Sequence, residues 1–182
     1  MKNKKYVYKI EGNNCYIYLE QRNGSIHEIL IDSKDLDRVI NYKYKWGVHF
    51  DPHTNSFYVK ATLYNGAQET PKYKNVYLHR FLLNVEDENI LVDHKTNNTL
   101  DNRKKNLRKS TSGNNSKNRK SKNSNNTSGY RNVSWLNGFW RVQLQINGKN
   151  NLFPEKFEKA NTAGLFAENM RRKYYNEYSG QN

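Results

Sequence analysis

The adjacent pair Asp93-His94 has the residue types that hydrolysis of a phosphodiester needs. This reaction requires an activated water and a cation beside the phosphate, which offsets charge on the leaving oxygen. A carboxylate suits a hard cation such as Mg²⁺, which takes oxygen ligands and keeps several waters. Histidine suits a general base for the water. Taken alone, the pair is also typical of a loop cap beside a surface histidine, so its neighbours decide the interpretation.

The segments around this pair predict a β–loop–β–helix finger. Residues 91–94 (Leu-Val-Asp-His) are typical of a strand that runs into a loop, and residues 106–108 (Asn-Leu-Arg) of the returning strand. Thr111 is a plausible N-cap and predicts a short helix that ends near Arg119. Successive residues of a strand point to opposite sides, so the carboxylate and the imidazole would face different directions. An asparagine amide oxygen on the facing helix can supply a second metal ligand.

Further spaced residues between 78 and 118 fit one known family. With Asp93-His94, the pattern closely resembles that of HNH homing endonucleases, whose loop after the histidine usually contains a glycine. The aligned residue here is Asn97, which tolerates the left-handed backbone conformation better than most residues do. The residues that carry the resemblance are Leu78-His79-Arg80, Asn98, Leu100-Asp101-Asn102-Arg103, Asn106-Leu107-Arg108, Thr111, Asn115 and Asn118.

The resemblance implies a metal site with Mg²⁺ or Mn²⁺ as the cofactor. Asp93 would be one ligand, and Asn115 on the predicted helix would be the second. The spacing of the helix ligand varies in the family, which leaves Asn114 and Asn118 open as alternatives.

The same resemblance implies roles in catalysis and in phosphate binding. His94 would be the general base, and Asn106 would be the structural residue that orients it. His79 has apolar neighbours, which favours a packed, hydrogen-bonded histidine over a second catalyst. The phosphate-contacting candidates are Arg80, Arg103 and Arg108.

The C-terminal part has the pattern of a three-stranded antiparallel meander followed by one helix. Asn137-Gly138 and Asn147-Gly148 are typical of type I′ turns. Apolar residues alternate with polar ones along the central strand, and Ala and aromatic residues recur at helical spacing from about Lys159 to Tyr178. The polar face of the sheet would carry Arg131, Arg141 and Gln143, and such a ribbon can enter a major groove.

This part also resembles an Apetala/ethylene-response-factor DNA-binding domain. The resemblance rests on residues 128–135 (Ser-Gly-Tyr-Arg-Asn-Val-Ser-Trp), on 140–142 (Trp-Arg-Val), and on Phe157 with an Ala-rich helix. Several HNH homing endonucleases carry such modules. By position, the residues implied to face DNA are Arg131, Trp135, Arg141 and Gln143, whereas Trp140 is either a contact or a core residue.

The charge of the chain is concentrated in one stretch. The formal net charge is +14, and residues 102–154 hold 12 Lys/Arg and no Asp or Glu. A basic stretch of this kind favours a polyanionic partner over an ordinary solvated surface. We expect double-stranded DNA, with Lys117 and Arg119 near the phosphate backbone.

These patterns together predict an α+β protein made of small modules. We expect a mainly β region at residues 1–75, a ββα-metal nuclease finger at 76–119, a basic linker at 120–129 and the sheet-and-helix DNA-binding domain at 130–182. Hydrophobic residues make up 35% of the chain, too few for one large core. The lone Cys15 excludes an intrachain disulfide.

The function expected from the sequence is metal-dependent cleavage of double-stranded DNA, of the phage or intron homing type. An HNH restriction enzyme and a non-catalytic, sequence-specific DNA-binding protein remain alternatives. No signal peptide or membrane span is visible, and no small-molecule cofactor is implied. We expect a monomer in the cytoplasm of a bacterium or of a phage-infected host cell.

Overall fold

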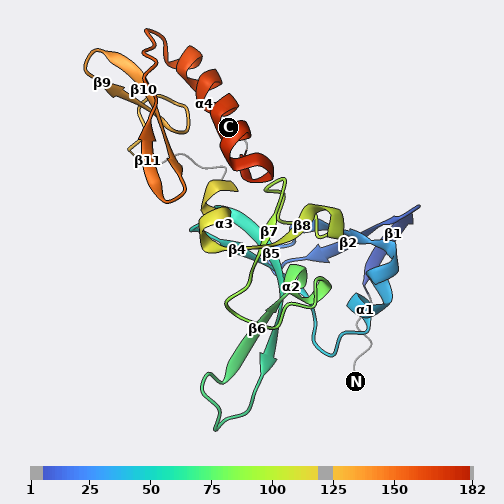
Figure 1. Cartoon of the computed structure of the whole chain (residues 1–182). Coiled ribbons are helices and arrows are strands. Elements are labelled where there is room, and N and C mark those ends of the chain that lie inside the picture. The colour runs from blue at the N-terminus through green and yellow to red at the C-terminus, as the bar shows by residue number, and fades with distance from the viewer. Residues whose placement is uncertain (1–5, 119–124, 181–182) are drawn as a thin grey trace. The chain divides into compact units, whose positions relative to one another are not determined.

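A computed structural model describes residues 6–118 and 125–180 of the chain. Within these residues the fold is α+β, with small antiparallel sheets and few helices, as Figure 1 shows. The strands form sheets in the orders β1-β2-β3, β4-β5-β6, β7-β8 and β11-β10-β9. The α+β class predicted from the sequence is therefore confirmed.

The first sheet supplies most of the N-terminal core. Its central strand alternates buried and half-buried residues, as expected for a strand with one face against a core. Cys15 is fully buried as a small apolar side chain, and Trp46 is 2% exposed, with its indole N–H donating to the carbonyl of Val39 at 2.9 Å. The elements are β1 (Val7–Glu11), β2 (Asn14–Glu20), β3 (Ile26–Asp32), η1 (Ser33–Asp35) and α1 (Leu36–Ile40).

Ser33 is not the N-cap of the turn that precedes α1. A 3-10 turn begins at Ser33 itself, and the residue at its N-cap is Asp32, which makes no side-chain capping hydrogen bond. The backbone N–H of Ser33 donates instead to the carbonyl of Asn13, at the turn between β1 and β2. The carboxylate of Asp32 accepts from the backbone N–H of Lys104 at 2.8 Å.

The second sheet adds a long hairpin and a short helix beneath the candidate site. The hairpin of β5 and β6 is visible in Figure 1. Val59 and Ala61 of the central strand are buried, and so are Leu78 and Leu82 of the helix, so both elements join the same core. The elements are β4 (Gly47–Asp51), β5 (Ser56–Tyr64), β6 (Tyr73–Tyr77) and α2 (Leu78–Leu82).

The predicted strand–loop–strand–helix order is present between residues 91 and 118. The first two strands are antiparallel, with Asp93 opposite Arg108. Thr111 precedes the helix, and its hydroxyl accepts from the N–H of Asn114 at 3.3 Å, which confirms the predicted cap. The elements are β7 (Leu91–His94), η2 (Lys104–Asn106), β8 (Leu107–Ser110) and α3 (Ser112–Asn118). Arg119 lies outside the described residues, as do residues 120–124 of the expected linker.

The C-terminal sheet and helix form a separate core. Both predicted type I′ turns are confirmed, because Asn137, Gly138, Asn147 and Gly148 have φ values of 52°, 81°, 50° and 76°. Figure 1 shows α4 lying along the sheet, and Val133, Val142 and Leu144 pack against alanines of this helix. The elements are β9 (Val133–Leu136), β10 (Phe139–Ile146), β11 (Lys149–Leu152), α4 (Ala160–Tyr175) and η3 (Asn176–Tyr178).

The chain divides into two compact units. One contains the residues up to His94 together with Asn98–Ser110, and the other contains Lys95–Asn97 and the residues from Thr111 onward. Leu78, Leu82 and Leu107 belong to the same core as the N-terminal strands, so the boundary expected near residue 75 falls inside one shared core. In the described residues, no helix combines the length and the apolar character that crossing a membrane requires.

Candidate nuclease site

Asp93 and Arg108 form a buried ion pair between β7 and β8. The Nε and Nη2 atoms of Arg108 donate to Oδ2 of Asp93 at 2.9 and 2.7 Å. Both side chains are less than 10% exposed, so the pair lies in a medium where an isolated charge would be costly. The two residues lie directly opposite each other in the register of the sheet. Arg108, a predicted phosphate contact, thus neutralises the carboxylate that the sequence nominated as a metal ligand.

His94 is the next residue, and its ring is held by an asparagine of the following loop. Nε2 of His94 lies 3.4 Å from Oδ1 of Asn102. The amide nitrogen of Asn102 donates to the carbonyls of Leu100 and Thr99, which fixes the amide so that its oxygen faces the ring. Because that oxygen can only accept, Nε2 carries the proton and the lone pair of the neutral ring is on Nδ1. In this tautomer Nδ1 is the basic nitrogen of the ring.

Two aromatic rings, those of His79 and Tyr58, pack near the imidazole of His94. The ring of His79 meets the ring of His94 edge-on at 5.1 Å between centroids, and the ring of Tyr58 lies 6.3 Å from it. Burial lowers the pKa of His94, against the opposing effects of its bond to Asn102 and of the charge on Asp93. Burial also lowers the pKa of His79, to about 3. Both rings are thus neutral at neutral pH, and His94 has the protonation state that a general base needs.

Asn106 and strand β3 fix the loop that carries Asn102. The amide nitrogen of Asn106 donates to the carbonyls of Asp101 at 2.8 Å and Asn98 at 3.3 Å. Leu30 of β3 exchanges backbone hydrogen bonds with the loop, donating to Leu100 at 3.0 Å and accepting from Asn102 at 2.7 Å. Asn106 thus has a structural role in shaping the loop. Its proposed effect on His94 stays a prediction.

The other two arginines that were predicted to contact phosphate also have partners within the chain. Arg80 donates to the carbonyls of Ile90 and Asp87 at 2.6 and 2.7 Å. Arg103 makes a side-on pair with Asp101, with its Nε and Nη2 atoms at 2.8 and 2.6 Å from the two carboxylate oxygens. The contacts of Arg80 hold the segment before β7, and those of Arg103 hold the loop between β7 and β8. A phosphate would have to share these guanidinium groups with protein partners.

Helix α3 carries the predicted second metal ligand. Asn115 is exposed, and its backbone N–H donates to the carbonyl of Thr111 at 2.9 Å. Of the two alternatives, Asn118 is 1% exposed, whereas Asn114 is half-buried and accepts from Lys117 at 3.3 Å. Exposure therefore favours Asn115 as the asparagine that can reach an ion. Asp93 and Asn115 belong to different compact units.

The side chains proposed as metal ligands have the oxygen atoms that a hard cation prefers. A carboxylate and an amide supply oxygen atoms, which Mg²⁺ and Mn²⁺ prefer. In the described part of the chain, three or more His, Cys, Asp or Glu side chains never gather where they could hold a metal ion. One carboxylate and one amide leave most of the coordination shell to water and phosphate oxygens, as is usual for Mg²⁺. An ion at Asp93 would share that carboxylate with Arg108.

The C-terminal sheet separates its predicted DNA-facing residues. Gln143 is exposed on the face away from α4, and Arg141 lies on the same face with Nη2 donating to the carbonyl of Phe153 at 2.8 Å. Arg131 is only 4% exposed, which differs from the exposed position that the sequence predicted, because its guanidinium donates to the carbonyl of Lys117. Trp135 is 54% exposed and pairs edge-on with Trp140, on the opposite face from Gln143.

No protein-family model, curated protein or solved structure matches this chain. The resemblances to HNH endonucleases and to Apetala/ethylene-response-factor domains therefore rest on the residues quoted above and on the geometry described here.

Sequence reasoning missed two residues beside the candidate base. Asn102 was part of the resemblance but received no role, and only the fold shows that its amide oxygen faces Nε2 of His94. Tyr58 comes from β5 and is far from His94 in the sequence, so no local pattern connects the two. Tyr58 lies in the region that was predicted to be mainly β, but which side chain of β5 meets the imidazole depends on tertiary packing.

Proposed function

We propose that this protein is a metal-dependent endonuclease that hydrolyses phosphodiester bonds in double-stranded DNA. The observation that carries the proposal is the state of His94. Its ring is neutral and positioned by Asn102, and it directly follows a carboxylate at the end of a strand that leads through a loop, a second strand and a capped helix. A purely structural finger has no need for this combination.

The proposed roles of the residues follow from their atoms. Nδ1 of His94 accepts the proton of the attacking water, and Asn102 holds the ring in the required tautomer. Asp93 and Asn115 are the proposed ligands of a divalent cation, which would supply charge stabilisation at the phosphate. Asn106 keeps the loop in shape through its two bonds to backbone carbonyls.

DNA is the proposed substrate because of the charge distribution. The basic excess is concentrated in residues 102–154, where it lies along the second half of the finger and the C-terminal sheet. Arg141, on the face of that sheet away from α4, has a side chain that can read base edges in a major groove, and Gln143 on the same face stays a predicted DNA contact. Trp135, Lys117 and the finger arginines Arg80, Arg103 and Arg108 remain predicted contacts, as do Arg131 and Arg119. Homing and restriction roles share this chemistry, and we favour homing.

One observation favours a second candidate, a DNA-binding protein that does not cut. The ion pair of Arg108 with Asp93 already neutralises the buried carboxylate, so the finger is stable as a structural unit. In this case the basic surface and the sheet would bind DNA while the finger only supports the fold. The two candidates make the same prediction for binding and opposite predictions for cleavage.

The experiment that tests the proposal is cleavage of a supercoiled plasmid by the full chain. We expect relaxed or linear product with Mg²⁺ or Mn²⁺ and none with EDTA, because the cation is part of the proposed chemistry. Retarded plasmid without any cleaved product, under all metal conditions, would favour the second candidate.

A further inference from the structure

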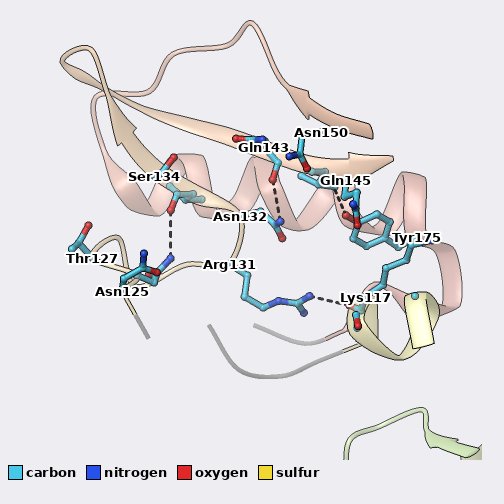
Figure 2. A pocket seen from close by; sticks show the side chains of 15 residues that line it. Lys117, Asn125, Thr127, Arg131, Asn132, Ser134, Gln143, Gln145, Asn150 and Tyr175 are labelled. Atoms are coloured by element: carbon cyan, nitrogen blue, oxygen red, sulfur yellow. Dashed lines mark hydrogen bonds between the residues drawn. The ribbon is translucent and has the colours of Figure 1, made fainter. Parts of the chain in front are cut away.

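A polar groove lies between α3 and the free face of the C-terminal sheet. Its volume is about 620 Å³, within the range of roughly 300–1,000 Å³ typical of small-ligand pockets. Figure 2 shows Gln143, Gln145 and Asn150 on the sheet side and Lys117 on the helix side. Gly113 and Ser116 complete the helix wall. All of these residues belong to one compact unit.

The lining has the chemistry of a nucleotide site. Carboxamides present both donors and acceptors, which is the complement that the edge of a nucleobase requires. Among the described residues that line the groove none is acidic, and two, Lys117 and Arg131, are cationic. A base with its phosphate would therefore meet amides and positive charge, and no carboxylate would repel it.

Two hydrogen bonds and one cation–π contact join the two walls of the groove. Nη2 of Arg131, which is 4% exposed, donates to the carbonyl of Lys117 at 2.9 Å. The ammonium of Lys117 lies 5.4 Å from the ring centre of Tyr175, and the Tyr175 hydroxyl accepts from the backbone N–H of Gln145 at 3.1 Å. Helix α3 is thus tied to both the loop before the sheet and the end of α4.

We propose that this groove binds one unpaired nucleotide of the DNA, a proposal that rests on the proposed function in taking DNA as the substrate. A paired duplex shows its base edges at the bottom of its own groove, and a protein element must project into that groove to read them. Here the amides of Gln143, Gln145 and Asn150 are the wall of a concave site, so the ligand must project into the protein. An unpaired base, unstacked from its neighbours, has that shape.

The groove shares helix α3 with one proposed metal ligand, Asn115. Gly113, Ser116 and Lys117 are spaced at three and four residues, so they share one face of α3. Asn115 is about 200° around the helix from Gly113, which places it on the opposite face. A nucleotide in the groove would therefore contact the same helix that carries the proposed metal ligand.

Binding of fluorescent DNA to the full chain in EDTA tests the proposal without cleavage. The three probes are a fully paired duplex, the same duplex with one unpaired nucleotide in a bulge, and one strand alone. We expect the bulged duplex to bind about 10-fold more tightly than the paired duplex, because each base contact of this kind is worth roughly 1–3 kcal/mol. Tight binding of the single strand as well would show that an open strand is also a source of the nucleotide.

Two variants, one from each wall of the groove, are tested so that the conclusion does not depend on a single substitution. Gln145→Ala removes a carboxamide from the sheet, and Ser116→Tyr fills the groove from the helix. Each should bring the preference for the bulge to about 1-fold while the affinity for paired DNA changes less than about 2-fold, since the free sheet face near Arg141 is untouched. Asn151→Ala is the matched control, because Asn151 is exposed on the other face of the same strand as Asn150.

Equal affinity of the wild type for paired and bulged DNA would overturn the groove proposal and leave the proposed nuclease function intact. A preference for the bulge that survives in both groove variants, with circular dichroism showing them folded, would overturn it as well. Failure of the wild type to bind any of the three DNAs would overturn both this proposal and the proposed function.

Discussion

Arg108 donates two hydrogen bonds to a single carboxylate oxygen of Asp93, and both side chains are buried. The pair joins neighbouring strands one residue before His94. It makes the charge of Asp93 tolerable in the absence of a metal ion, and it places a fixed cation beside any ion that binds there.

Arg108→Met should lower the free energy of unfolding by about 3–5 kcal/mol, because it removes the guanidinium that neutralises the buried Asp93 carboxylate. Urea denaturation measures the effect. The matched control is Arg172→Ala, which breaks the largely exposed pair with Glu168 and should cost at most about 1 kcal/mol. Similar losses in both variants would mean that the buried pair contributes no more than a surface pair.

Arg108→Met also tests whether a metal ion binds at Asp93. Millimolar Mg²⁺ should raise the melting temperature of Arg108→Met more than that of the wild type or of Arg172→Ala, since a cation bound to Asp93 replaces the missing charge. If all three proteins respond alike to Mg²⁺, Asp93 is not where the ion binds.

His79 makes the stability of the N-terminal unit sensitive to acid. Its pKa falls from 6.5 to about 3 on folding, because burial disfavours the charged ring. Above pH 6.5 the ring is neutral in both states, and as the pH falls from 6.5 toward 3 only the unfolded state takes up the proton. Wild type should therefore lose about 1.4 kcal/mol of stability per pH unit more than His79→Phe does in this window.

Urea denaturation at several pH values between 7 and 4 would measure this difference in slope. The range starts above pH 6.5, where the ring is neutral in both states, and extends into the window where only the unfolded state is protonated. The control His53→Phe changes a histidine whose side chain is exposed, and it should follow the wild-type slope. A slope for His79→Phe equal to that of the wild type would show that the buried ring takes up a proton in the folded state.

Gly164 of α4 lies directly beneath the ring of Tyr130, and a Cβ atom there would overlap the ring. Gly164→Ala should therefore destabilise the C-terminal unit, because overpacking costs about 1–3 kcal/mol and exceeds the gain of about 1 kcal/mol in helix propensity. Gly113→Ala in α3 is the matched control, since its Cβ would meet open space, and it should be stabilising. The melting temperatures of both variants measure the effect. A higher melting temperature for Gly164→Ala than for the wild type would contradict the close approach of Gly164 to the Tyr130 ring.

Arg141→Ala should weaken sequence discrimination more than it slows cleavage. Its guanidinium lies on the free face of the sheet, and one good base contact is worth about 1–3 kcal/mol of discrimination. Selection of cleaved sites from a randomised DNA library measures the preference, and Arg172→Ala on α4 serves as the control. An unchanged site preference would show that Arg141 does not contribute to base recognition.

The sequence predicted best where local backbone chemistry decides the structure. The two Asn-Gly turns of the C-terminal sheet were predicted because the type I′ turn needs a positive φ at both positions, which these residues tolerate. The strands around Asp93 and the cap at Thr111 were predicted for similar reasons. In α4, in contrast, the spacing of Ala and aromatic residues did not identify every buried position. Tyr174 is 40% exposed, and the buried face follows Ala163, Ala167, Arg171 and Tyr175 at four-residue spacing.

What the sequence did not predict depends on contacts between distant segments. The side chains of Arg80, Arg103 and Arg108 were assigned to phosphate from type and position alone, and their partners inside the chain become visible only with the fold. Strands β4 and β6 were also not predicted; each has only five residues, and none of these residues is buried. The burial of Arg131 follows from the approach of α3, which no local pattern encodes.

The central claim is that the imidazole of His94 deprotonates the water that attacks the phosphate. It is tested most directly by the rate at which supercoiled plasmid is lost with Mg²⁺ for His94→Ala, with His53→Ala as the matched histidine control. We expect His94→Ala to be slower than wild type by at least about 100-fold, with DNA affinity retained and His53→Ala unaffected. Cleavage by folded His94→Ala at the wild-type rate would contradict the account.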